Sequence, residues 1–196
     1  MEVETAIEES KSQYYPPGGL LIWIIVFLEF ITFSAALLVY LNMRNADIEV
    51  YNSSQAMLNS TLGMVNTIVL ITSGLFMATS LIQLRSGNKK KSVFYLSLTT
   101  LFGILFLVLK AYEYYEKFSL GINLGTDQFF LFYWLLTGFH FLHVLVAVVL
   151  LSYMLIKTRS GFYSSSNYED VESVGVFWHM CDLIWIFLFP ILYLLH

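Results

Sequence analysis

Long apolar stretches separated by shorter polar segments dominate the chain. A helix needs about 20 apolar residues to cross hydrocarbon about 30 Å thick. Five runs of about this length lie at residues 19–41, 63–84, 92–115, 129–156 and 174–193. Backbone amides in lipid must be hydrogen-bonded within their own segment, and these runs lack the alternation of a membrane barrel strand. The pattern therefore predicts an all-α integral membrane bundle of five transmembrane helices.

The segments between the runs are polar, or contain glycine and clustered charges, and are predicted to be loops. They cover residues 42–62, 85–91, 116–128 and 157–173. The first 18 residues are acidic and end in Pro16, Pro17 and Gly18, which do not continue a helix into the first run. We expect a mobile acidic head at residues 1–18 and a single membrane domain at residues 19–196.

Composition supports a lipid environment. Hydrophobic residues make up 58% of the 196 positions and charged residues only 12%, about half the usual share in soluble domains. A single cysteine, Cys181, excludes an intrachain disulfide, a CxxC zinc or redox site, a CxxCH haem attachment and a two-cysteine copper centre. The net charge of −4 and the lack of a large basic tract give no support for a nucleic-acid partner.

The basic residues predict how the chain is oriented, because cytoplasmic loops carry an excess of Lys and Arg. The head and the second and fourth loops together hold seven of them: Lys11, Arg85, Lys89, Lys90, Lys91, Lys157 and Arg159. The opposite side holds only Arg44 and Lys117. We therefore expect a multi-pass membrane protein with a cytoplasmic N-terminus and a C-terminus outside.

Glu29 places a carboxyl group where burial of a charge costs free energy. It is the eleventh residue of the first run, near the bilayer centre, where a charge costs roughly 2.5 to 3.5 kcal/mol on insertion scales. A partner must come from another helix, or the group must be protonated. Two interpretations remain open: a protonated carboxyl that only joins helices, or a group at a lipid or proton site.

Histidines form pairs in the last two runs. His140 and His143 are three residues apart in the fourth run, as are His179 and Asp182 in the fifth, so each pair shares a helix face. Imidazoles at this spacing can bind a metal or relay a proton with a carboxylate. They equally suit hydrogen bonds to neighbouring helices, and we expect these structural roles and no metal site.

Glu113 follows Lys110 by three residues and precedes Lys117 by four. This spacing predicts an ion pair on one helix face, and the position near the end of the third run places it at the membrane boundary. Trp178 and Trp185, seven residues apart, are expected to pack on one face of the fifth helix.

Several motifs occur in a fixed order along the spans. They are FLEFITF at 27–33, NTIVLITSG at 66–74, EYYE at 113–116, TGFHFLHV at 137–144 and FWHMCDLIW at 177–185. Together they resemble subunit III of the haem-copper respiratory oxidases over nearly the whole chain after the head. The chain is similar to the last five of the family's seven spans, the short bacterial form that includes quinol-oxidase subunit III and the nitric oxide reductase-associated NorE protein. The ending HMCDLIWIFLFP resembles NorE most.

The resemblance implies a non-catalytic accessory subunit that stabilises a catalytic subunit I in aerobic respiratory electron transport. It implies that Glu29 matches the family's carbodiimide-reactive intramembrane glutamate, with His143 as its hydrogen-bond partner. It also implies bound phospholipid, with haem and copper held by the partner subunit. The short form of the family favours the bacterial plasma membrane as the location. A haem-copper core needs about six histidines, and this chain has four, so we expect no redox centre of its own.

Other functions remain open beside the oxidase subunit. A NorE-like component of a nitric oxide reductase complex is the nearest. A small proton-conducting transporter would use Glu29, His143 and Asp182 along a wet path. A metal-dependent membrane enzyme would use His140, His143 and His179.

Overall fold

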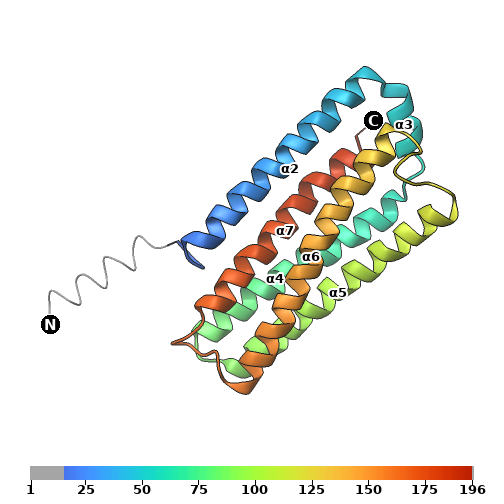
Figure 1. The fold of residues 1–196 in the computed structure, drawn as a ribbon. Helices are drawn as coiled ribbons and strands as arrows, with labels where there is room; N and C mark the ends of the chain where they lie inside the picture. Colours follow the sequence, from blue (N-terminus) through green and yellow to red (C-terminus); the bar gives the residue numbers. More distant parts are fainter. Residues whose placement is uncertain (1–15, 196) are drawn as a thin grey trace.

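The described part of the chain, residues 16–195 of a computed structural model, consists of six helices (Figure 1). They are α2 (Leu20–Ala46), α3 (Ile48–Gln55), α4 (Ser60–Arg85), α5 (Lys89–Ser119), α6 (Gln128–Ser160) and α7 (Glu169–Tyr193). All except α3 are long and apolar enough to cross a membrane. The structure therefore confirms the predicted all-α bundle with five membrane-spanning helices.

Side-chain caps and glycines set several helix ends. The side chains of Asn59 and Asp127 accept hydrogen bonds from backbone amides in the first turns of α4 and α6, at 3.0 and 2.8 Å. These bonds satisfy amides that have no partner inside the helix. At the other end of α6, Gly161 adopts a left-handed conformation with φ of 91°, which favours glycine because it has no Cβ.

The helices extend beyond the apolar runs that predicted them. The predicted span 129–156, for example, belongs to a helix that ends at Ser160. The segment 42–62 was expected to be a loop, but its first residues continue α2 and its middle forms α3. Hydropathy marks only the part of a helix inside hydrocarbon. Tyr51 of α3 is fully buried against Tyr40 and Phe129, so tertiary packing stabilises this short helix.

The bundle core lies among α4, α5, α6 and α7. Helices α4 and α5 are held together by Ser73, whose hydroxyl donates to the Thr99 carbonyl at 2.9 Å, and by Ser80, which donates to the Ser92 carbonyl at 2.9 Å. Gly103 of α5 makes room for the ring of Trp178, which is fully buried. Small side chains thus bring these helices close, as is typical of packing in lipid.

Helix α2 lies along one edge of this bundle, beside α7 and α6 (Figure 1). It turns a narrow stripe inward, including Val26, Phe33, Leu37 and Tyr40. Its other large apolar side chains are exposed, among them Leu21, Phe27, Ile31 and Leu38. Such a surface suits contact with lipid or another membrane helix rather than water.

We predicted a mobile head at residues 1–18, and its first 15 residues lie outside the described part of the chain. From there on, Gly18 is tied to the start of α7. Its amide donates to a carboxylate oxygen of Glu172 at 3.0 Å, and its carbonyl accepts from the Ser173 hydroxyl at 2.7 Å. Glu172 also pairs with Arg85 at the end of α4.

Candidate functional site

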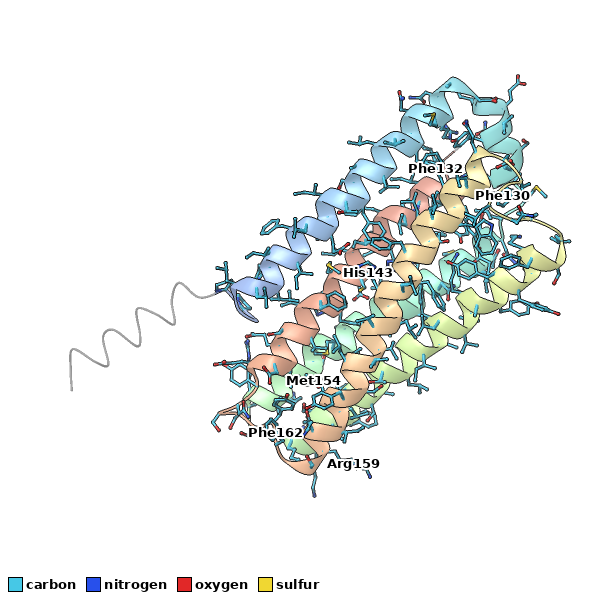
Figure 2. All side chains as sticks on the ribbon, viewed as in Figure 1. Phe130, Phe132, His143, Met154, Arg159 and Phe162 are labelled. Carbon is cyan, nitrogen blue, oxygen red and sulfur yellow. The ribbon has the colours of Figure 1, made fainter. Side chains whose placement is uncertain are left out.

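Glu29 and His143 meet between α2 and α6. A carboxylate oxygen of Glu29 lies 3.3 Å from Nε2 of His143, the pairing that the family resemblance implies. Figure 2 shows His143 about midway along the bundle, on the side of α6 that faces α2. The rings of Phe33, Phe139 and Phe177 surround the imidazole. The pair is thus a polar contact inside an apolar seam.

The imidazole's other nitrogen determines how this contact is protonated. Nδ1 of His143 lies 2.8 Å from the Phe139 carbonyl, which can only accept, so Nδ1 carries a hydrogen. In the neutral ring Nε2 is then an acceptor facing Glu29. The contact is favourable when one proton lies between the two groups, either on the carboxyl or on an imidazolium. In both arrangements the pair as a whole is neutral, which lowers its cost in hydrocarbon.

His140 has a separate environment, although it is three residues from His143. Its side chain is fully buried, stacks on Trp185 with ring centroids 5.2 Å apart, and meets the edge of Phe106. Neither ring nitrogen has a hydrogen-bond partner within the described residues. Of the predicted cluster of Glu29, His140 and His143, the structure therefore joins only the first and third by a polar contact.

Potential metal ligands are dispersed in residues 16–195. No group of three His, Cys, Asp or Glu side chains gathers there. The three histidines of the metal-enzyme alternative therefore do not form one cluster in the described structure. His179 instead lies beside Asp182, with Nδ1 and a carboxylate oxygen 3.4 Å apart.

Lys110 and Glu113 form a buried ion pair in the core, 3.1 Å apart. Both side chains are essentially inaccessible, so the pair lies inside the bundle rather than on its surface. Lys117 does not join it, because its ammonium donates to the Met57 carbonyl at 2.8 Å. The position of this pair at the membrane boundary stays a prediction.

Two tyrosine side chains complete this pair, although the sequence pattern did not indicate them. The hydroxyls of Tyr133 and Tyr193 donate to one oxygen of Glu113 at 2.8 and 2.6 Å, while Lys110 holds the other. The ammonium also lies about 5 Å from the aromatic rings of Tyr133 and Trp185. The Lys110–Glu113 cluster, these four polar side chains, connects α5, α6 and α7. Tyr133 lies seven residues before His140, a spacing that marks one helix face and was available in the sequence.

Two apolar grooves run beside α2. A groove of about 480 Å³ lies between α2 and α7, and another of about 240 Å³ lies between α2 and α6. Phe33 lines both of them, and the larger also contains Leu37 and Ile184. Their walls are almost wholly apolar, which suits hydrocarbon chains.

Outside the membrane spans, Tyr163 is buried in the connection between α6 and α7. Burial raises the pKa of its phenol to about 12, and the hydrogen bond that it donates to Asp170, at 3.0 Å, acts in the same direction. The phenol is thus held neutral while it ties the loop to the first turn of α7.

The fold and the buried polar contacts define a multi-pass integral membrane protein built as a helical bundle. A sequence profile described as "Cytochrome c oxidase subunit III" matches residues 19–196, nearly all of the described chain. The chain therefore belongs to the cytochrome c oxidase subunit III family.

Curated relatives agree with this family. The chain is similar to cytochrome c oxidase subunit 3 of Osphranter robustus, with 33% identity over 131 residues that cover 66% of this chain and 49% of that protein. It is also similar to the subunit 3 of Synechocystis sp., with 36% identity over 132 residues that cover 67% and 55% of the two chains. It is likewise similar to cytochrome c oxidase subunit 3 of Spodoptera frugiperda, with 32% identity over 131 residues that cover 66% of this chain and 86% of that protein. The matched part is thus about half the length of two of these three relatives.

Proposed function

We propose that this chain is a non-catalytic accessory subunit of a haem-copper terminal oxidase in aerobic respiratory electron transport, packed against the catalytic subunit. The single observation that carries the proposal is the match of the family profile to residues 19–196. The Glu29–His143 contact supports it, because it lies at the position that the family resemblance implies. Haem and copper would belong to the partner.

The supporting role follows from how α2 is held. Among the described residues, α2 contacts the bundle through a narrow stripe, and Glu29–His143 is its polar link to α6. We propose that this link keeps α2 at a fixed distance, so that the two grooves beside it accommodate phospholipid acyl chains. An ordered lipid layer would preserve the approach of protons or oxygen to the catalytic subunit and slow its inactivation during turnover.

The test follows activity loss during turnover in the purified complex. Glu29→Ala removes the link, and we expect it to shorten the active lifetime several-fold. Glu29→Gln retains an amide that can donate to Nε2 of His143, so its effect should be smaller. Glu49→Gln, on the exposed surface of α3, is the matched control. Unchanged durability in both Glu29 variants would reject the role.

Haem spectra of the co-purified complex test the identity of the partner. A haem-copper oxygen reductase is expected. The narrower resemblance to the NorE branch remains a prediction, and a nitric oxide reductase spectrum would support that alternative. Purification of the intact chain without any haem-bearing partner would contradict both.

The proposed orientation, with the N-terminus in the cytoplasm of a bacterial cell, rests on the basic residues. Arg85 and Lys89 lie at the junction of α4 and α5, and Arg159 lies at the same end of the bundle (Figure 2). Arg44 and Lys117 belong to the opposite end. In a Cys181→Ser background, a cysteine at Ser165 should react with an impermeant thiol reagent only after the membrane is opened.

A further inference from the structure

A third groove, of about 540 Å³, lies between α4 and α7 and is distinct from the two beside α2. Its walls include exposed Leu75 and Leu183, and its floor holds His179 and Asp182. A neighbouring hollow of about 230 Å³ shares His179 with it and extends to Arg85. Together they form what we call the α4–α7 groove.

The floor of the α4–α7 groove contains an unsatisfied acceptor. Oδ1 of Asp182 has no hydrogen-bond partner within the described residues, although the side chain is only 8% exposed. Its other oxygen faces Nδ1 of His179, whose side chain is 43% exposed. Gly74 permits this arrangement, since a Cβ there would collide with the Asp182 carboxylate. The groove is thus lined by a half-exposed imidazole and by a carboxylate whose Oδ1 is buried without a partner among the described residues.

The depth of His179 and Asp182 in the membrane limits which groups can form hydrogen bonds with them. Asp182 is thirteen positions after the first residue of α7 and eleven before the last, or about 20 and 16 Å from the two ends at the usual helical rise. Lipid headgroups lie at the membrane surfaces, and acyl chains carry no hydrogen-bond donor. A polar pair left against acyl chains would be costly, because hydrocarbon offers polar groups no hydrogen-bond partner.

We propose that the α4–α7 groove is a docking surface for a transmembrane helix of a companion subunit, and that this helix forms a hydrogen bond with the His179–Asp182 pair. The complementary group is an amide, hydroxyl or cationic side chain at mid-membrane depth. Ala78, half-buried where the two hollows meet, is small enough to permit close approach of the helix. The inference rests on the proposed function, because it assigns one face to the partner that the function requires.

The first experiment fills the groove in the full chain and measures haem recovered with it. Ala78→Phe and Asp182→Leu are expected to lower the haem recovered per chain by about threefold to thirtyfold, the range of interhelical hydrogen bonds in membranes. Asp182→Asn retains an acceptor oxygen and should stay within about twofold of the unchanged chain. Ala35→Phe, on the exposed face of α2, is the matched control and should change nothing.

The second experiment does not depend on a substitution that fills the groove. A photoreactive phenylalanine at Leu183 should cross-link to the haem-bearing subunit. The same group at Leu142, an exposed leucine of α6, is the comparison and should react with lipid. Both leucines are accessible, at 46% and 57%.

The outcomes separate the two proposals. Haem recovery that is unchanged in Ala78→Phe and Asp182→Leu would overturn the docking surface, and so would cross-links from position 183 to lipid or another small amphiphile alone. An equal loss in Ala35→Phe would overturn it as well. The proposed function fails separately, if the unchanged chain carries no haem-bearing partner at all.

Discussion

Replacing Glu113 with Gln removes the carboxylate that Lys110 contacts in the described structure. The ammonium would remain essentially inaccessible, with the Tyr193 hydroxyl at 2.6 Å and the Tyr133 hydroxyl at 3.3 Å as its neutral neighbours. Breaking a buried pair in this way costs about 3 to 5 kcal/mol, because an uncompensated charge is left behind. For a chain of this size, that is a fall in melting temperature of roughly 6 to 20 °C.

The double variant Lys110→Met with Glu113→Gln makes the prediction specific. It removes both charges and keeps similar volumes, so we expect it to recover most of the stability that the single variant loses. Lys110→Met alone should cost less than Glu113→Gln, because the carboxylate keeps the hydrogen bonds from Tyr133 and Tyr193. Thermal unfolding in detergent, followed by circular dichroism, measures all three. A double variant no more stable than Glu113→Gln would refute the reasoning.

Two further predictions concern packing and the loop between α6 and α7. Gly103→Ala should destabilise the bundle by about 1 to 3 kcal/mol, because the new Cβ would lie 2.8 Å from both Trp178 and Val148. Gly138→Ala is the control, since a Cβ there meets open space and should not lower stability. Equal melting temperatures of the two variants would contradict this prediction. The Tyr163 phenol should ionise near pH 12 rather than about 10, so its contribution to stability is complete below pH about 10 and declines toward 12. An ultraviolet difference titration against Tyr163→Phe measures this, and a midpoint near 10 would contradict it.

The resemblance paired Glu29 with His143, and these side chains lie in contact in the structure, but spacing alone did not separate His143 from His140. Residues three apart share a helix face only approximately, and here that difference decides their environments. His143 faces α2, while His140 stacks on Trp185 in the core. The rotation of α6 against its neighbours, a property of the packed bundle, determines which imidazole meets the carboxyl.

The sequence by itself determined that most of the chain is surrounded by lipid, and how many helices span the membrane. Run length and low charge are local properties, and the need to pair every backbone amide in lipid turns each apolar run into a helix. It also identified the ionisable groups within or beside the spans, including Glu29, Glu113 and Asp182.

Only the tertiary structure decided the partners of those groups. Tyr193 reaches Glu113 from eighty positions away, and α3 forms where Tyr51 packs on distant aromatic rings. Such contacts depend on the register and rotation of several helices at once, and no local pattern encodes them. The cost of an unpaired polar group in hydrocarbon dictates that partners must exist, whereas the packing of the whole bundle determines which residues they are.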